Sequence, residues 1–208
     1  FAAISAYANQ TCGVTLDGTT RCWGSSSTWK WSGATGTTTS TTATYGLDHA
    51  CNVTTCWGGD HVAYVGLLGN GVGWPTGQQA TISSPAPFAS VDAGSMHTCG
   101  LTASANIYCW GGNDHGELGD GTMRDRWTPV KVSGTTTFST VSAGAYRTCA
   151  LSSSGDAWCW GRGVNGSNGD GTLGYRTVPA LVSSQVDQTP IAIRSIRIAN
   201  VRDTSFTV

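Results

Sequence analysis

Short segments of alternating apolar and polar residues, rich in Thr, Val, Trp and Tyr, follow one another along the chain and are separated by glycine-containing turns. Residues of these types favour β-strands. Two of the segments, residues 91–101 and 141–151, align position by position, and so do the turns at 118–122 and 168–172 that follow them. The pattern therefore predicts many short strands within an internal repeat.

Four pairs of cysteines mark the units of this repeat, and in each pair the second cysteine is followed by Trp-Gly. The first cysteines of successive units lie 39, 48 and 50 residues apart. Self-similarity at this period, with β-forming residues and Gly turns, is typical of the blades of a β-propeller. The pairs are Cys12 and Cys22, Cys51 and Cys56, Cys99 and Cys109, and Cys149 and Cys159.

The spacing of the cysteines favours disulfides over other cysteine chemistry. Zinc knuckles and haem attachment sites need Cys-x2-4-Cys or Cys-x-x-Cys-His spacings that this chain lacks, and a catalytic thiol does not recur four times. Turn-like sequences separate the widely spaced partners, so the two cysteines of a pair can face each other across an antiparallel hairpin. Four such bridges, in a chain that begins at Phe1, indicate a secreted protein in an oxidising environment.

Composition narrows the function further. The 208 residues carry a net charge of −1, and only 11% of them are charged, against roughly 25% in an average globular chain. No basic stripe is present to bind nucleic acid, and no apolar run approaches the roughly 20 residues of a membrane-spanning helix. Nine tryptophans argue against a disordered chain.

The third unit carries the fullest version of the motif. Residues 91–101 read Val-Asp-Ala-Gly-Ser-Met-His-Thr-Cys-Gly-Leu, and residues 110–121 read Trp-Gly-Gly-Asn-Asp-His-Gly-Glu-Leu-Gly-Asp-Gly. This sequence resembles the regulator of chromosome condensation repeat family, whose pattern ends with a Pro-x-x-Val strand. Glu117 stands at the family's Gln position, Arg147 replaces the repeat His in the fourth unit, and the first two units match less completely. Cysteines at these positions resemble secreted bacterial versions of the repeat.

The resemblance covers residues 1–183 and implies an all-β fold, a small β-propeller of four repeats with one disulfide per repeat. The family's usual propeller has seven blades. We expect each unit to open with the Pro-containing strand, which leaves the strand at 178–182 over. That strand could complete the first blade of the same chain or of a neighbour, or the chain could be part of a longer propeller. Residues 184–208 form a linker and a β-strand tail that resembles the start of a fibronectin type III domain.

Several residues that suggest chemistry are better explained by the repeat. His49 and His97 occupy the same repeat position, where the family uses a structural His. The Asp114-His115-Gly116-Glu117 segment suggests a metal site, but the repeat pattern accounts for it as a turn. One Glu and scattered Asp residues do not mark the paired carboxylates of a glycosidase. We therefore expect no catalytic residue, no metal and no cofactor.

Candidate binding residues lie in the variable segments that follow each Trp-Gly. Such segments gather on one face of a propeller, and Trp and Arg are enriched at binding hot spots. These residues are Trp29, Trp31, Tyr64, Trp74, Arg124, Arg126 and Trp127. The alternative is that the aromatic side chains pack between blades.

Three functions are consistent with these observations. The first is a non-enzymatic extracellular interaction or scaffold module that binds a protein or a glycan through one loop face. The second is a structural subunit of an extracellular fibre or surface layer, which self-associates into a polymer by sharing terminal strands. The third is a secreted enzyme inhibitor, because a related secreted β-lactamase inhibitor binds its target through loops on one face. Nucleic-acid binding and membrane insertion are not expected.

Overall fold

The computed structural model describes residues 1–7, 10–17, 20–24, 44–46, 49–58, 66–72 and 80–183. These residues form fifteen β-strands and one short 3-10 helix, η1 (Val164–Gly166). The strands are β1 (Ala3–Tyr7), β2 (Gln10–Val14), β3 (Thr20–Gly24), β4 (Thr44–Tyr45), β5 (His49–Cys51), β6 (Thr55–Gly58), β7 (Ala80–Thr81), β8 (Phe88–Ala93), β9 (His97–Thr102), β10 (Ile107–Gly111), β11 (Arg126–Lys131), β12 (Phe138–Ala143), β13 (Arg147–Ser152), β14 (Ala157–Gly161) and β15 (Arg176–Leu181).

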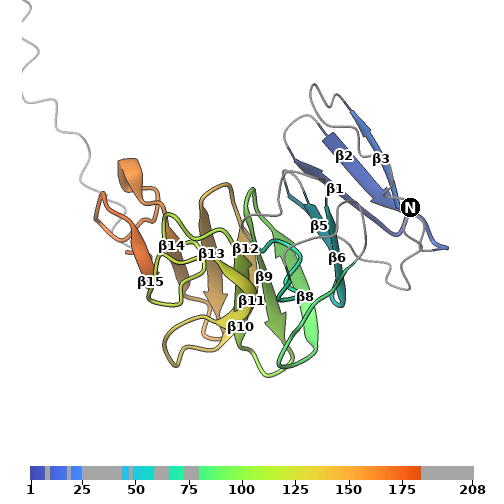
Figure 1. Ribbon diagram of the computed structural model, residues 1–208. Helices are drawn as coiled ribbons and strands as arrows, with labels where there is room; N and C mark the ends of the chain where they lie inside the picture. The colour runs from blue at the N-terminus through green and yellow to red at the C-terminus, as the bar shows by residue number, and fades with distance from the viewer. Residues whose placement is uncertain are drawn as a thin grey trace, which may run out of the picture.

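The strands form four antiparallel sheets, which confirms the predicted all-β propeller fold with four repeats. The first sheet has the order β1-β2-β3, and the second, third and fourth are β4-β5-β6-β7, β8-β9-β10-β11 and β12-β13-β14-β15. The sheets follow one another along an arc, with the first and the fourth at its two ends (Figure 1). First strands of neighbouring sheets contact each other, β1 with β4, β4 with β8 and β8 with β12, as in propeller blades around an axis.

The Pro-containing strands end their sheets instead of opening them, so the prediction that the strand at 178–182 is left over was wrong. In the fourth sheet β15 pairs with β14, with Ala180 opposite Cys159, and in the third sheet β11 pairs with β10 in the same way. Pro129 and Pro179 lie in these outermost strands. Because proline has no N–H to donate, an edge strand suits it and a central strand does not. The fourth sheet is therefore complete without closing onto the first.

Three disulfides confirm three of the four predicted bridges, and each joins two adjacent strands of one sheet. Cys51–Cys56, Cys99–Cys109 and Cys149–Cys159 face each other directly, with Cα atoms 4.1 Å apart in every pair. That distance belongs to a non-hydrogen-bonded antiparallel pair, as the sequence argument requires. Cys12 and Cys22 are also directly opposed across β2 and β3, but their side chains lie outside the described ones.

The apolar cores lie between sheets. One packs Cys51, Cys56 and Ile82 of the second unit against Phe88 and Trp110 of the third. The next packs residues of the third sheet against the fourth and contains Cys99, Leu101, Ile107, Cys109, Leu118, Val132, Phe138, Ala150 and Trp160. Trp110 and Trp160 are completely buried, so these Cys-Trp-Gly tryptophans are core residues, as predicted.

Each tryptophan also ties its sheet to the loop of the preceding sheet. Trp110 Nε1 donates to the backbone oxygen of Leu67 at 3.0 Å, and Trp160 Nε1 donates to that of Glu117 at 2.8 Å. Gly69 lies against the Trp110 ring, and a Cβ there would come within 2.7 Å of Nε1. Residues 66–71 thus repeat the turn at 116–121, a match that the comparison of the second unit by sequence overlooked.

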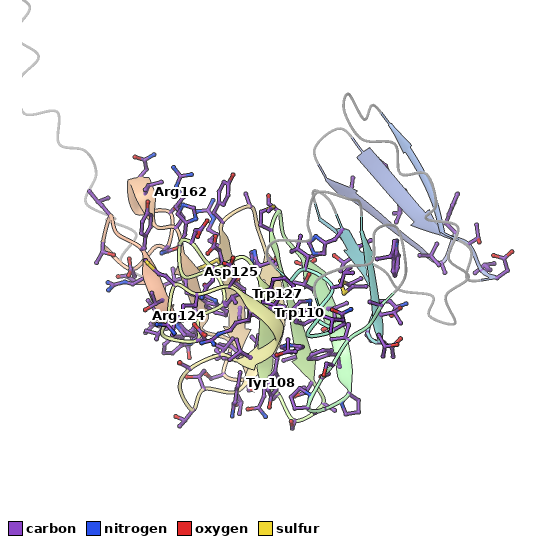
Figure 2. The ribbon with its side chains drawn as sticks, in the orientation of Figure 1. Tyr108, Trp110, Arg124, Asp125, Trp127 and Arg162 are labelled. Atoms are coloured by element: carbon purple, nitrogen blue, oxygen red, sulfur yellow. A yellow bond between two sulfur atoms is a disulfide. The ribbon has the colours of Figure 1, made fainter. Side chains whose placement is uncertain are left out.

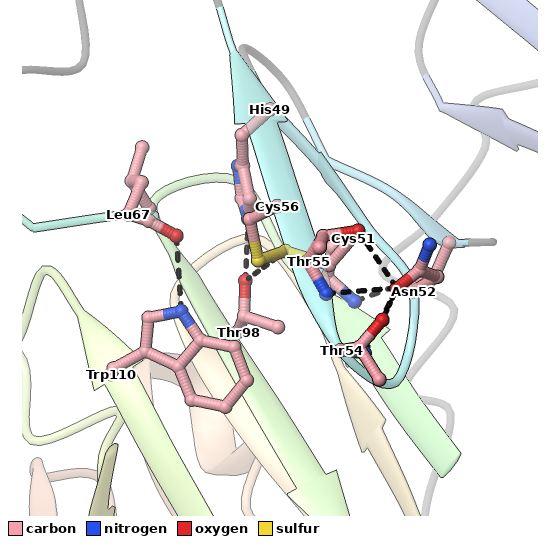
Figure 3. Close-up of a disulfide and its surroundings, with 11 residues drawn as sticks. His49, Cys51, Asn52, Thr54, Thr55, Cys56, Leu67, Thr98 and Trp110 are labelled. Carbon is pink, nitrogen blue, oxygen red and sulfur yellow. Dashed lines mark hydrogen bonds between the residues drawn. A yellow bond between two sulfur atoms is a disulfide. The ribbon is translucent and has the colours of Figure 1, made fainter. Parts of the chain in front are cut away.

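The repeat histidines act as buried links between sheets. His49 Nε2 and Thr98 Oγ1 are hydrogen-bonded at 2.6 Å (Figure 3), and His97 Nε2 and Thr148 Oγ1 at 2.9 Å. Thr148 gives its single hydroxyl hydrogen to the backbone oxygen of Glu117, so His97 donates through Nε2. Burial, with a smaller contribution from His97, lowers the pKa of His49 to about 3, and burial lowers the pKa of His97 to about 4. Both rings are neutral at physiological pH, which agrees with the structural role expected for them.

Candidate binding face

The connections at one end of the sheets form a continuous set of loops, called here the loop face. Because the strands alternate in direction, residues 94–96 and 112–125 of the third sheet leave at the same end, and residues 144–146 and 162–175 of the fourth sheet match them. Residues 66–72 of the second unit join this set, since they contact Trp110 and Trp127. Figure 2 shows the side chains of Arg124, Asp125, Trp127 and Arg162, which belong to these loops or lie at their ends.

Asn113 braces the longest loop of the third sheet from inside. Its side chain is completely buried, and Nδ2 lies 3.1 Å from the backbone oxygen of Thr122 and 3.0 Å from that of Arg124. Its Oδ1 accepts the backbone N–H of Leu118 at 3.0 Å, and its own N–H donates to Asp125 Oδ1 at 2.8 Å. These bonds fix both ends of the loop against its middle, so side chains that point outward are held on a rigid backbone.

A repeated ion pair closes the same loops near the strand that follows. Arg126 Nε donates to Asp120 Oδ2 at 2.7 Å, and Arg176 makes the same contact with Asp170. Burial raises the pKa of the Asp120 carboxyl, but hydrogen bonds from Thr122 and Arg126 outweigh this and the pKa ends below its ordinary value. The guanidinium of Arg126 therefore has a structural role in closing the loop. The same contact in the fourth sheet agrees with that role.

Trp127 and Arg124 keep surface toward solvent. Trp127 is 37% exposed, and its backbone oxygen accepts the N–H of Gly71 at 2.8 Å, which holds the start of β11 against the loop of the second unit. A Cβ on Gly66 would lie 3.0 Å from Trp127 Cγ, so the indole rests on that glycine. Arg124 is exposed at the end of the braced loop.

The structure brings three of the predicted binding residues, Arg124, Arg126 and Trp127, to the loop face. The other four, Trp29, Trp31, Tyr64 and Trp74, lie outside the described residues. Their part in binding stays a prediction.

An aromatic group on the loop face was missed by sequence reasoning. His115 lies between two tyrosines, with its ring centroid 5.1 Å from Tyr146 and 5.1 Å from Tyr175. Tyr146 and Tyr175 are 42% and 47% exposed, and the Arg162 guanidinium lies over the Tyr146 ring, 5.5 Å from its centroid. Tyr146 stands where the third unit has Met96. The sequence did carry one signal for this group. Tyr146 is an aromatic residue at a loop position where the repeat does not require an apolar one.

Beneath this group, His115 and Glu117 form a hydrogen-bonded pair. His115 Nδ1 lies 3.1 Å from Glu117 Oε1, and the His115 backbone N–H donates to Oε2 at 2.8 Å. Burial raises the pKa of the Glu117 carboxyl, although the hydrogen bonds from His115 oppose that shift. Glu117 thus holds the turn, as expected from the repeat. In the part of the chain that the structure describes, no group of three or more His, Cys, Asp or Glu side chains could hold a metal ion.

Comparisons with known proteins agree with this architecture. The family description "Regulator of chromosome condensation (RCC1) repeat" matches residues 104–151 in one form, and residues 88–117 and 138–169 in another. The fold is similar to that of yeast RCC1 (Prp20) bound to Kap60, with a TM-score of 0.72 at 18% identity. It is similar to Prp20p from Saccharomyces cerevisiae, in a structure concerned with binding to Gsp1p and histones, with a TM-score of 0.73 at 18% identity. For human WBSCR16 the TM-score is 0.64 at 16% identity.

These similarities cover 88%, 88% and 87% of this chain but only 48%, 50% and 52% of the three solved chains. The chain thus spans about half the length of the structures it matches. Its sheets, their repeated tryptophan and histidine links and these similarities define a β-propeller repeat protein. Within that class, residues 88–169 carry repeats of the RCC1 type, and the blade architecture is similar to that of RCC1 propellers.

Two findings bear on where the chain is found. Its three described disulfides are of a kind that persists in oxidising compartments. Among the described residues, no helix has the length and apolar character needed to cross a membrane.

Proposed function

We propose that this chain is a non-enzymatic extracellular interaction module that binds a partner protein through its loop face. The observation that carries the proposal is a set of exposed aromatic and arginine side chains on braced loops. Trp127 and Arg124 come from the third sheet, and Tyr146 and Tyr175 come from the fourth. Residues of these types dominate the energetics of protein interfaces.

The bracing of the loops supports this proposal. Ordering a flexible loop on binding costs free energy, and a preorganised loop avoids most of that cost. The bonds of Asn113 and the Asp120–Arg126 ion pair already fix the loop that carries Arg124 and leads to Trp127. Yeast RCC1, a structural relative of this chain, was solved with the protein Kap60 bound. An extracellular setting is favoured by the disulfides.

A selection experiment tests the loop face directly. The full, oxidised chain would be immobilised and used to select binders from a phage-displayed random peptide library, with a glycan array probed in parallel. We expect selected peptides whose affinity falls about 30-fold for Trp127→Ala and for Tyr146→Ala, because hot-spot side chains are worth about 2 kcal/mol or more. Leu16→Ala, at an exposed turn residue of the first sheet, is the control and should not change affinity.

Two results would contradict this function. Peptide affinity that is unchanged by Trp127→Ala and Tyr146→Ala would place binding elsewhere. Binding to glycans alone would replace the protein partner with a carbohydrate, the other ligand class considered from the sequence.

A further inference from the structure

The two ends of the arc of sheets present complementary surfaces. Every sheet has a forward face, toward the next sheet in the chain, and a backward face, toward the preceding one. At the interface of the third and fourth sheets, Cys99 and Leu101 belong to the forward face, and Phe138 and Trp160 belong to the backward face. The interface of the second and third sheets repeats this arrangement. The forward face of the fourth sheet and the backward face of the first have no such counterpart among the described residues.

The forward face of the fourth sheet keeps the apolar character of a buried interface. Leu151 is 42% exposed, whereas its counterpart Leu101 in the third sheet is 8% exposed. The Cys149–Cys159 disulfide lies on the same face, and Cys149 is partly exposed where its counterpart Cys99 is fully buried. The interface of the third and fourth sheets buries this same combination, a leucine beside a disulfide, against the following sheet.

The backward face of the first sheet carries the residues that fill such a face. Phe1 packs over Gly13 as Phe88 packs over Gly100, since a Cβ on either glycine would lie 2.6 or 2.5 Å from the phenyl ring. Phe1 is 66% exposed and Ile4 is 64% exposed, whereas Phe88 is 6% exposed.

The backbone register extends the match. Trp23 lies opposite Thr11 across β2 and β3. Trp110 lies opposite Thr98, and Trp160 lies opposite Thr148, in the same way. The first sheet therefore has a tryptophan at the position that links the third and the fourth sheet to the sheets before them.

The fourth sheet has the glycine that lies under such a tryptophan, but a valine side chain covers it. Gly69 and Gly119 lie under the rings of Trp110 and Trp160, and Gly169 has the same left-handed conformation, with φ of 68°. A Cβ on Gly169 would lie 2.8 Å from Val182 Cγ1, so a docking indole has to displace the Val182 side chain. The backbone oxygens of Leu67 and Glu117 accept the indole N–H groups, and Ser167 holds the equivalent position.

In the fourth sheet that acceptor is occupied by an exposed side chain. Arg147 Nη1 donates to the Ser167 oxygen at 3.0 Å. An exposed arginine side chain can leave this oxygen at little cost when an indole approaches, because water can replace its hydrogen bond.

We propose that the forward face of the fourth sheet docks onto the backward face of the first sheet in a second copy of this chain. The contact is head to tail and continues the internal sheet interfaces across two molecules. Apart from Ser167 and Gly169, which belong to the loop of the fourth sheet, it uses surfaces other than the exposed aromatic and arginine side chains of the loop face, so it does not depend on the function proposed above. A head-to-tail contact closes into a ring when its rotation allows, and eight sheets lie within the range of known propellers.

Two charge substitutions, one on each face, test the proposal. Leu151→Glu alters only the forward face of the fourth sheet, and Ile4→Glu alters only the backward face of the first. Light scattering after size exclusion should give twice the 21.5 kDa chain mass for the unaltered, oxidised protein and a single chain mass for each variant. An equimolar mixture of the two variants should form a one-to-one complex, because each supplies the face that the other lacks.

A matched control places a glutamate at an exposed leucine outside both faces, with Leu16→Glu in the turn that follows β2 of the first sheet. This variant should associate like the unaltered chain. An open series of larger species would also support head-to-tail docking, with a rotation that does not close. A monomeric unaltered chain would overturn the proposal and assign the faces to other occupants, such as residues 184–208 or further repeats. Variants that fail to form a complex on mixing would overturn it as well.

Discussion

The loops that follow β10 and β14 have the same frame but different internal bracing. Both place positive-φ glycines at the same three positions, Gly116, Gly119 and Gly121 in one and Gly166, Gly169 and Gly171 in the other. In the third sheet the amide of Asn113 fills the space inside the loop, whereas Gly163 holds that position in the fourth. There Asn168, at the position of Leu118, occupies the space instead, since a Cβ on Gly163 would lie 2.6 Å from Asn168 Nδ2.

The difference shows what the repeat requires. Asn168 Nδ2 donates to the backbone oxygen of Gly161 at 3.1 Å, but its Oδ1 is buried with no hydrogen-bond partner. Asn113 uses both ends of its amide. The loop needs a side-chain amide inside it, and either of two positions can supply that amide. The amide in the loop of the third sheet forms more hydrogen bonds than the one in the loop of the fourth.

The largest effect should come from breaking the interface that joins these two sheets. Trp160→Ala removes a fully buried indole and its bond to the loop of the third sheet, and should lower the free energy of unfolding by about 3–5 kcal/mol. Trp127→Ala, at a tryptophan that is 37% exposed, should cost less than about 1 kcal/mol. Urea denaturation of both variants measures the difference. Equal losses would mean that the sheets are not held together through Trp160.

The third sheet should contribute to the pH dependence of stability in a way that the fourth does not, because the fourth has Arg147 at the position of His97. The folded-state pKa of His97 is lowered from 6.5 to about 4, so the unfolded chain takes up a proton first as the pH falls. Stability from the neutral ring is complete above pH 6.5 and declines by about 1.4 kcal/mol per pH unit between 6.5 and about 4.

The matched variant is His97→Gln, because Gln10 stands at this position in the first sheet. Denaturation midpoints between pH 6.5 and 4 should show a shallower decline in this variant, with the remainder due to His49. A decline unaffected by the substitution would show that His97 is not buried as a neutral ring.

The smallest effects should distinguish the two loop amides. Asn113→Ala leaves the buried N–H of Leu118 without its acceptor and should cost about 2 kcal/mol. Asn168→Leu removes the bond to the Gly161 oxygen together with a buried oxygen that has no partner, and should therefore cost no more than about 1 kcal/mol. Thermal unfolding of the two variants is the measurement. A larger loss for Asn168→Leu than for Asn113→Ala would reverse the ranking of the two braces.

Features that repeat in the sequence were predictable. The cysteines that share a spacing face each other across hairpins, and the repeat histidines are buried links, because both depend on local register within one unit. The placement of the Pro-containing strand was not predictable from the repeat alone. A repeat can be divided at any strand, and only the pairing of β15 with β14 decides to which sheet that strand belongs.

The candidate site was predicted less completely, because it depends on contacts between units. Trp127 and Arg124 were recognised because they lie in the variable segment between a Trp-Gly motif and the next Pro-containing strand. His115, Tyr146 and Tyr175 come from three separate loops and meet only when the third and fourth sheets pack together. Their spacing along the chain therefore does not predict that these side chains are in contact.

The position of the disulfides has a mechanical consequence. The described bridges close hairpins of 5 or 10 residues within single sheets, and none of them joins one sheet to the next. A chain stretched from its ends would thus meet only non-covalent resistance between sheets. Because repeat units interact with their neighbours, it should yield one sheet at a time and lengthen in steps. Each bridge would shorten the extension gained when its sheet unfolds by the length of the closed loop. Chemical reduction would therefore lengthen each step without changing the number of steps.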